Sequence, residues 1–189
     1  MSTETQLDEP DADGGLISWL DIEIVESGAR EDEASVGRGR AAIIHAAVAG
    51  DELCDAMDAD SGELEALYSV YFDGEWLKDE FAEGFGHDLL YVSELELAPV
   101  WRGRNIELAV VRRLCDTVGS ACALVVVPYA NEAEAAHWRA MGFEKTSGAK
   151  GLMHLRQAFE QPRVVRDGYD DERFRVEPVD SADKRRRMN

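Results

Sequence analysis

Residues 88–128 restrict the fold most, because two strand-like stretches enclose one helix-like stretch. Residues 88–98 alternate between apolar and other side chains, residues 106–118 repeat apolar side chains at helical spacing, and residues 121–128 are a continuous apolar run typical of a buried strand. Two sets of side chains in the first strand are expected on opposite faces: Tyr91, Ser93, Leu95 and Leu97 on one, and Leu90, Val92, Glu94 and Glu96 on the other. This order predicts an α/β fold with a mixed central sheet flanked by helices.

The segments before this centre extend the same architecture. Residues 16–26 alternate and residues 41–49 are almost wholly apolar, so we expect two strands joined by the polar loop 27–39. Residues 51–83 carry apolar side chains at spacings of three and four, which predicts two or three short helices.

The segments after the centre complete a single domain. A helix is expected from Asn131, which can serve as its N-cap, to Met141, followed by a hairpin of residues 143–145 and 151–155. From Gln157 onward the chain is charged and shows no apolar period. Three parts are therefore expected, a disordered acidic leader, one domain and a charged C-terminal tail, over residues 1–15, 16–156 and 157–189.

The composition favours a cytoplasmic protein with its own core. Hydrophobic residues make up 45% of the 189 residues, which suits one globular domain. No apolar run approaches the roughly 20 residues that cross a bilayer, and the first residues do not resemble a signal segment, so we expect no membrane partner. Cys54, Cys115 and Cys122 lack paired or metal-ligand spacing and are predicted to be core side chains, and we expect no metal site.

The net charge of −19 restricts the partners. So acidic a surface repels phosphate backbones and attracts cations, which argues against a nucleic-acid partner.

The turn P-V-W-R-G-R-N-I-E at residues 99–107 is the candidate binding feature. A tight turn from a strand into a helix presents unpaired backbone N–H groups at the positive end of the helix dipole, where phosphates bind. Gly103 would let a ligand approach the backbone closely, and Arg102 and Arg104 add positive charge.

Two side chains of this turn complicate that interpretation. Asn105 takes up space, and Glu107 suits the helix dipole but would repel a diphosphate. The nonapeptide by itself therefore fits two interpretations equally, a phosphate-binding loop and an arginine-rich turn capped by Glu107.

Two stretches resemble signatures of the GNAT superfamily of N-acetyltransferases: L-E-L-A-P-V-W-R-G-R-N-I (95–106) and N-E-A-E-A-A-H-W-R-A-M-G-F-E (131–144). In that family an R/Q-x-x-G-x-G/A turn follows a strand that ends near a proline, and binds the diphosphate of acetyl-coenzyme A through backbone amides. Asn131, Trp138, Gly142 and Phe143 fall in register with the second signature, N-x-x-A-x-x-F/L-Y-x-K-x-G-F. The resemblance covers roughly residues 88–155 and is that of a divergent member. It implies a single-domain GNAT-like fold with acetyl-coenzyme A as co-substrate.

The resemblance also implies which residues would serve the site. The cofactor-binding positions would be Leu97, Arg102, Gly103, Arg104, Asn105, Ile106, Asn131 and Trp138. Backbone N–H groups at a splay in the strand near Leu97 would polarise the thioester carbonyl.

Two kinds of side chain, carboxylates and a phenol, are candidates for proton transfer. A carboxylate on that strand would take the proton of the amine, for which Glu94 and Glu96, about 7 Å apart on one face, are candidates unless they face solvent or the cations of the next strand. The family's tyrosine, often the acid that protonates the thiolate, is Trp138 here, and an indole cannot give up that proton at neutral pH. Tyr129 is the nearest phenol in sequence, either as this acid or as an ordinary loop tyrosine.

Two functions follow from the resemblance. The first is an acetyl-CoA-dependent N-acyltransferase that acts on an amine of a small cationic molecule or of a protein. The alternative is a catalytically inactive GNAT-like module that binds a coenzyme A relative or a protein partner. The net charge argues against aminoacyl-tRNA as the acceptor, and exposed sheet edges make a homodimer plausible.

Overall fold

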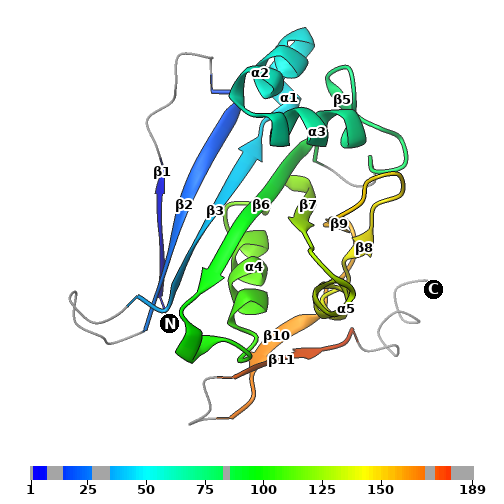
Figure 1. Cartoon of the computed structure of the whole chain (residues 1–189). Helices are drawn as coiled ribbons and strands as arrows, with labels where there is room; N and C mark the ends of the chain where they lie inside the picture. Colours follow the sequence, from blue (N-terminus) through cyan, green and yellow to red (C-terminus); the bar gives the residue numbers. More distant parts are fainter. Residues whose placement is uncertain (1, 8–14, 27–34, 83–85, 169–172, 180–189) are drawn as a thin grey trace.

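A seven-stranded mixed sheet, in the order β1-β2-β3-β6-β7-β9-β8, runs through the molecule (Figure 1). The computed structural model describes residues 2–7, 15–26, 35–82, 86–168 and 173–179. The strands of the sheet are Ser2–Leu7 (β1), Ile17–Val25 (β2), Gly37–Ile44 (β3), Asp88–Leu97 (β6), Cys122–Pro128 (β7), Glu144–Lys145 (β8) and Leu152–Arg156 (β9). β6 and β7 are parallel, and the other neighbouring pairs are antiparallel. The expected α/β fold with a mixed sheet is confirmed.

Helices cover both faces of this sheet. They are Ala46–Ala49 (α1), Leu53–Asp60 (α2), Gly62–Tyr71 (α3), Ile106–Asp116 (α4) and Glu132–Ala140 (α5). Two hydrophobic clusters separate by face, since Leu90 packs with the cluster of α4 and α5, and its neighbour Leu89 packs with the cluster of α1, α2 and α3. None of the helices in the described residues is both long and apolar enough to cross a membrane.

Short elements connect these layers. They are the 3-10 helices Gly50–Glu52 (η1) and Pro99–Trp101 (η2), and a small hairpin of Phe72–Asp73 (β4) and Trp76–Leu77 (β5).

The segment from residue 41 to residue 49 differs from its prediction as one strand. β3 begins at Gly37, inside the expected loop, and ends at Ile44, and the alanine-rich Ala46–Ala49 is helix α1. Alanine favours helix, and the carboxylate of Asp88 accepts a hydrogen bond from the backbone N–H of Ala47 at 3.1 Å. The rest of the expected loop, residues 27–34, lies outside the described residues.

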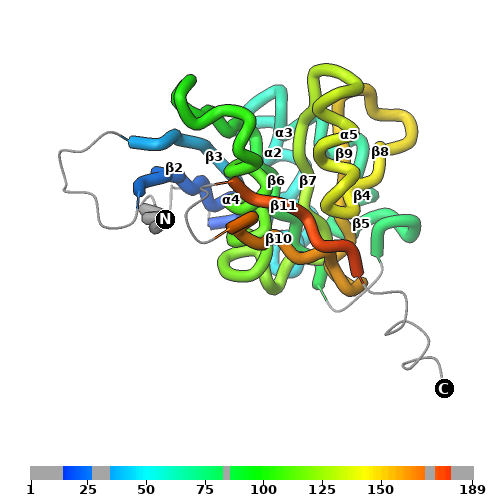
Figure 2. Tube along the Cα trace, turned by 90° about the horizontal axis from the view of Figure 1, so that it is seen from below, coloured from blue at the N-terminus to red at the C-terminus, as the bar shows by residue number. Residues whose placement is uncertain are grey.

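Both ends of the chain contribute strands where a leader and a tail were expected. Residues 2–7 form β1, which pairs with β2, and residues 8–14 lie outside the described part. Arg163–Arg166 (β10) and Phe174–Glu177 (β11) form a hairpin whose apolar side chains pack on the cluster of α4. Figure 2 shows this hairpin beside α4.

The cysteines only partly match their prediction. Cys115 and Cys122 are buried, as expected, but Cys54 is exposed on α2 because it lies on the outward side of that helix.

Candidate functional site

A β-bulge at Ser93 interrupts strand β6. Arg40 pairs with Glu94 and Ala41 pairs with Val92, so Ser93 is an extra residue that has no paired residue in the strand register with β3. Its hydroxyl donates a hydrogen bond to the backbone carbonyl of Arg40 at 3.2 Å.

The bulge reverses the side-chain alternation of β6. Val92 precedes the bulge and Leu95 follows it, yet both pack with the cluster of α4. Glu94 and Glu96 therefore lie on the face opposite to Val92. Their expected placement on one face with Val92 is wrong, because one extra residue shifts every later side chain to the other face.

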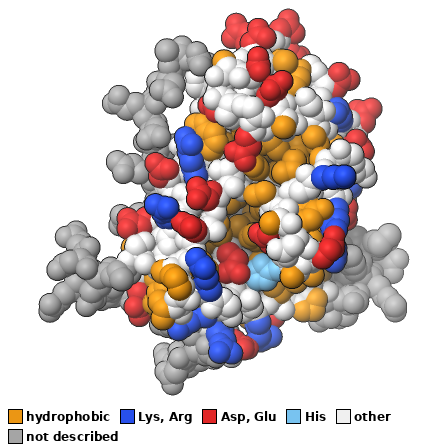
Figure 3. All heavy atoms as spheres, viewed as in Figure 1, with side chains coloured by type: hydrophobic (Ala, Val, Ile, Leu, Met, Phe, Trp, Pro, Cys, Tyr) orange, Lys and Arg blue, Asp and Glu red, His pale blue; other side chains and the backbone are white. Residues whose placement is uncertain are grey.

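A cavity opens where β6 and β7 stop pairing. The parallel register runs from Asp88 and Cys122 to Tyr91 and Val126, and beyond these residues the strands diverge between α4 and α5 (Figure 1). The gap holds a cavity of about 320 Å³. On this face of the molecule, apolar side chains gather in the middle with charged side chains around them (Figure 3). The divergence begins earlier in the strand than the splay expected near Leu97.

Residues from β6, β7, α4, α5 and the turn before α4 line the cavity. They are Val92, Ser93, Leu95, Glu96, Leu97, Arg102, Gly103, Glu107, Val127, Pro128, Glu134, His137 and Trp138. Of the residues predicted from sequence, the structure thus brings Glu96, Leu97, Arg102, Gly103 and Trp138 together.

The turn before α4 leaves its backbone open. Gly103 has φ 73, and a Cβ at this position would meet no atom within 4 Å. Asn105 also has a left-handed backbone, with φ 58. Its side-chain amide donates a hydrogen bond to the carbonyl of Phe174 in β11 at 2.7 Å. The hairpin thus engages the side chain of Asn105, a predicted binding residue that does not line the cavity.

The two arginines of the turn are held by local contacts. Arg102 donates a hydrogen bond from Nε to the carbonyl of Leu97 at 3.0 Å. The guanidinium of Arg104 lies over the Trp101 ring, 4.6 Å from its centroid. These contacts fix both charges next to the turn.

Glu107 meets His137 across the cavity wall and links α4 to α5. Its Oε1 lies 2.9 Å from Nε2 of His137, and its Oε2 is buried without a hydrogen-bond partner in the described structure. Burial by itself would raise the pKa of Glu107, but His137 and the backbone N–H of Glu107 outweigh it, so that the pKa lies below its usual value. The carboxylate is therefore an ionised group at the start of α4.

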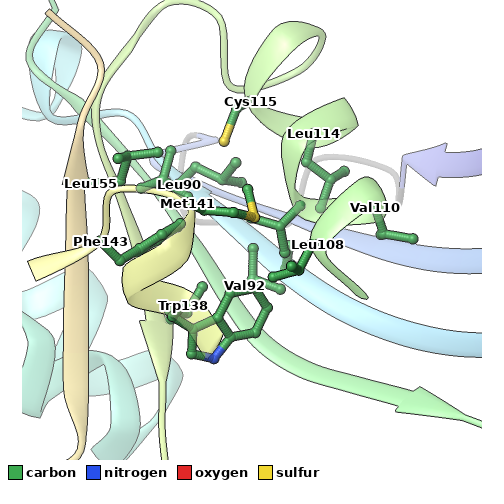
Figure 4. Packing of buried hydrophobic residues seen from close by; sticks show 14 of the residues in the cluster. Leu90, Val92, Leu108, Val110, Leu114, Cys115, Trp138, Met141, Phe143 and Leu155 are labelled. Atoms are coloured by element: carbon green, nitrogen blue, oxygen red, sulfur yellow. The ribbon is translucent and has the colours of Figure 1, made fainter. Parts of the chain in front are cut away.

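Trp138 lines the same cavity and carries a buried, unpaired donor. Its side chain is buried, with 6% exposed, and Nε1 has no hydrogen-bond partner among the described residues. Figure 4 shows the indole nitrogen on the edge of the ring that points away from the packed cluster. A ligand carbonyl could accept this hydrogen bond.

The three predicted catalytic side chains are not assembled around the cavity. Glu96 lines it and accepts a hydrogen bond from Arg38 at 3.0 Å, whereas Glu94 is exposed and does not line it. The ring of Tyr129 lies under the ammonium of Lys145, 5.1 Å away, and is not part of the cavity wall.

Two predicted binding residues stabilise helices instead of lining the cavity. Asn131 caps α5 by accepting hydrogen bonds from the backbone of Ala133 and Glu134, at 3.0 and 3.1 Å. Ile106 is buried in the cluster of α4.

Sequence reasoning missed Ser93, Glu134 and His137 as parts of the wall. His137 directly precedes Trp138 and lies three residues after Glu134, so that the helical period of α5 could have placed them on one side. In the described residues, no group of three or more His, Cys, Asp or Glu side chains is placed to hold a metal ion.

The site fits one part of acetyl-coenzyme A better than the other. The open turn at Gly103 and the apolar gap suit a narrow acyl-bearing arm. At the start of α4, where a phosphate would accept hydrogen bonds from backbone N–H groups, the carboxylate of Glu107 lines the cavity and adds a negative charge. This end does not fit a diphosphate as it stands.

Comparison with solved structures adds a distant likeness. No family model matches the chain, and no curated protein matches it. A polyamine N-acetyltransferase of Drosophila melanogaster, which catalyses the formation of N-acetylagmatine, has a solved structure that covers 78% of this chain and 82% of its own. The two are 15% identical, with a TM-score of 0.44. A likeness at this level does not assign the chain to a family.

Proposed function

We propose that the chain is an N-acyltransferase of the GNAT type, which transfers an acyl group from an acyl thioester to an amine. The observation that supports it most is the bulge at Ser93 in β6, with the cavity that opens next to it. The resemblance of residues 95–106 and 131–144 to the two signatures supports it further, and implies acetyl-coenzyme A as the donor.

Acyl transfer needs a polarised carbonyl and a dry, oriented site. An acyl thioester supplies the activated acyl group. Beyond Tyr91, β6 has no pairing with β7, so its backbone N–H groups on that side are available to a carbonyl oxygen in the cavity. Val92, Leu95 and Val127 exclude water there, and the Trp138 N–H can donate to a second carbonyl of the donor.

Glu96 is the proposed general base. It alone among the predicted catalytic side chains lines the cavity, and Arg38 holds its carboxylate in place. It would accept the proton of the attacking amine, directly or through a water molecule. With Trp138 in place of a tyrosine, the departing thiolate would take its proton from water.

The acceptor would be an amine of a small cationic molecule or of a protein. Three carboxylates, Glu96, Glu107 and Glu134, line the cavity, and the chain carries a net charge of −19. Such a field attracts a protonated amine and guides it to the site.

The contact between Glu107 and His137 favours a second function, a GNAT-like module that binds a ligand without acyl transfer. It joins α4 to α5 at the end of the cavity where the resemblance places a diphosphate. Among the described residues that line the cavity there is also no phenol to serve as a general acid.

Thermal melting with acetyl-coenzyme A, followed by an assay for free thiol with a panel of amines, separates the two functions. A ligand at a hundredfold its Kd adds about 2.7 kcal/mol of stability, so binding is readily seen as a shift in Tm. Binding with amine-dependent thiol release supports the transferase. Binding without release supports the module.

The base is tested with a matched pair of variants. Glu96→Gln should lower turnover by about a hundredfold with unchanged donor binding, because a general base contributes at least that much. Glu94→Gln alters a carboxylate two residues away that does not line the cavity and should keep the rate. Equal rates for both variants would remove Glu96 from the mechanism.

A further inference from the structure

The carboxylate of Glu107 lies where a ligand anion would otherwise be bound. Glu107 is in the first turn of the eleven-residue helix α4 and lines the cavity. The N-terminus of a helix attracts negative charge, and here the carboxylate of Glu107 already supplies it.

The surroundings keep that carboxylate in place and charged. His137 approaches Oε1 at 2.9 Å, while the buried Oε2 has no partner in the described structure. Glu107 lines the cavity together with Glu96 and Glu134, and among the described lining residues Arg102 carries the guanidinium. A second anion brought to this wall would meet the negative charge of Glu107 at close range.

We propose that Glu107 determines which acyl donor the site accepts. Its carboxylate acts as a built-in anion at the start of α4, so that the cavity favours a thioester on a neutral pantetheine-like arm and discriminates against the diphosphate of coenzyme A. The apolar gap and the unpaired Trp138 N–H are suited to such an arm, which is narrow and carries amide carbonyls. This inference rests on the proposed transferase or binding function of the same cavity.

The experiment measures Kd for two donors that differ in charge, acetyl-coenzyme A and S-acetylpantetheine. The test variant is Glu107→Gln, which removes the charge and keeps the size of the side chain. The control is Glu132→Gln, which changes the net charge equally on the exposed first turn of α5, outside the cavity. Melting without ligand verifies that each variant is folded.

Glu107→Gln should tighten the binding of acetyl-coenzyme A about tenfold and leave the Kd of S-acetylpantetheine unchanged, since only the first ligand carries a diphosphate. Glu132→Gln should change neither Kd. An unchanged Kd for acetyl-coenzyme A in Glu107→Gln, or an equal change for both donors, would overturn the inference while leaving the proposed function intact.

Inorganic pyrophosphate tests Glu107 independently of the donor. It should raise the Tm of Glu107→Gln and not that of the wild-type protein. If neither thioester binds to either protein, the proposed function fails. The pyrophosphate result then tests the role of Glu107 by itself. A rise in the Tm of Glu107→Gln, but not of the wild-type protein, supports the built-in anion, and any other result overturns it.

Discussion

The side-chain amide of Asn105 donates a hydrogen bond to the backbone carbonyl of Phe174 at 2.7 Å. The backbone N–H of Phe174 in turn donates to the carbonyl of Arg104 at 2.8 Å. Two hydrogen bonds thus join strand β11 to the turn that begins α4. A glycine at position 105 would suit the left-handed backbone, but it would lack the first of these bonds.

We expect Asn105→Asp to lower the free energy of unfolding by about 1–3 kcal/mol, because aspartate tolerates the same backbone but leaves the Phe174 carbonyl without its donor. Asn105→Gly should cost about 1 kcal/mol, since relief at positive φ partly offsets the lost bond. Urea unfolding at neutral pH measures both. Wild-type stability in Asn105→Asp would show that the bond contributes nothing.

Gly39 packs directly against the part of β6 that follows the bulge. A Cβ at this position would lie 2.7 Å from the carbonyl oxygen of Glu94 and 2.8 Å from a methyl of Leu95. We therefore expect Gly39→Ala to destabilise the protein by about 1–3 kcal/mol, as overpacking does. Gly62→Ala is the control, because nothing lies within 4 Å of its Cβ. Chemical denaturation of the two variants should differ accordingly, and similar midpoints would contradict this packing.

The order of strands and helices from β6 to β9 could be predicted because apolar period and length differ between the two kinds of element. The bulge at Ser93 could not, since Tyr91, Ser93, Leu95 and Leu97 also fit one face of an unbroken strand, and the extra residue is defined by the pairing with β3. Hairpin β10–β11 could not be predicted from the sequence for another reason. Its strands have four residues each, with few apolar side chains between charged ones, and they are stabilised by contact with α4 rather than by their own pattern.

The candidate site was predictable in part, for similar reasons. Gly103 and Trp138 follow from the motif, and both line the cavity. The contact of Glu107 with His137 joins helices whose packing no local pattern specifies. Of Glu94 and Glu96, the structure brings Glu96 to the cavity wall, a difference that the sequence pattern does not show because the two are alike in it.

His154 makes stability depend on pH. It is buried, and its Nδ1 lies 2.9 Å from the hydroxyl of Thr146, which in turn lies 2.7 Å from the hydroxyl of Tyr71. Burial lowers the pKa of His154 below its usual 6.5, and the positive charge of Arg156 lowers it further. Below pH 6.5 the unfolded chain therefore binds this proton more readily than the folded protein does.

The free energy of unfolding should accordingly fall as the pH is lowered from 7 towards 5, with a slope of at most about 1.4 kcal/mol per pH unit for one proton. His154→Gln should be less stable at pH 7 and should lose that part of the slope. Urea titrations at several pH values measure it. Parallel slopes for the two proteins would exclude His154 as the source.

Trp138→Phe should weaken ligand binding and leave the stability of the protein nearly unchanged. The variant removes a buried donor that has no partner in the described structure, which offsets the lost packing, so we expect a change in stability within about 1 kcal/mol. The affinity for an acyl thioester whose carbonyl accepts the hydrogen bond of the indole should fall about tenfold, because this bond exists only in the complex. Calorimetric titration with S-acetylpantetheine measures the loss, and an unchanged Kd would remove the indole N–H from ligand binding.

The bond between Asn105 and Phe174 also has a consequence for biosynthesis, because its two residues are 69 positions apart. The ribosome synthesises all seven strands of the sheet before it makes β11. A chain that ends after Arg156 has every strand of the sheet, but the start of α4 still lacks its anchor. The turn beside the cavity is thus made midway through translation but is secured only by the last strand that the structure describes.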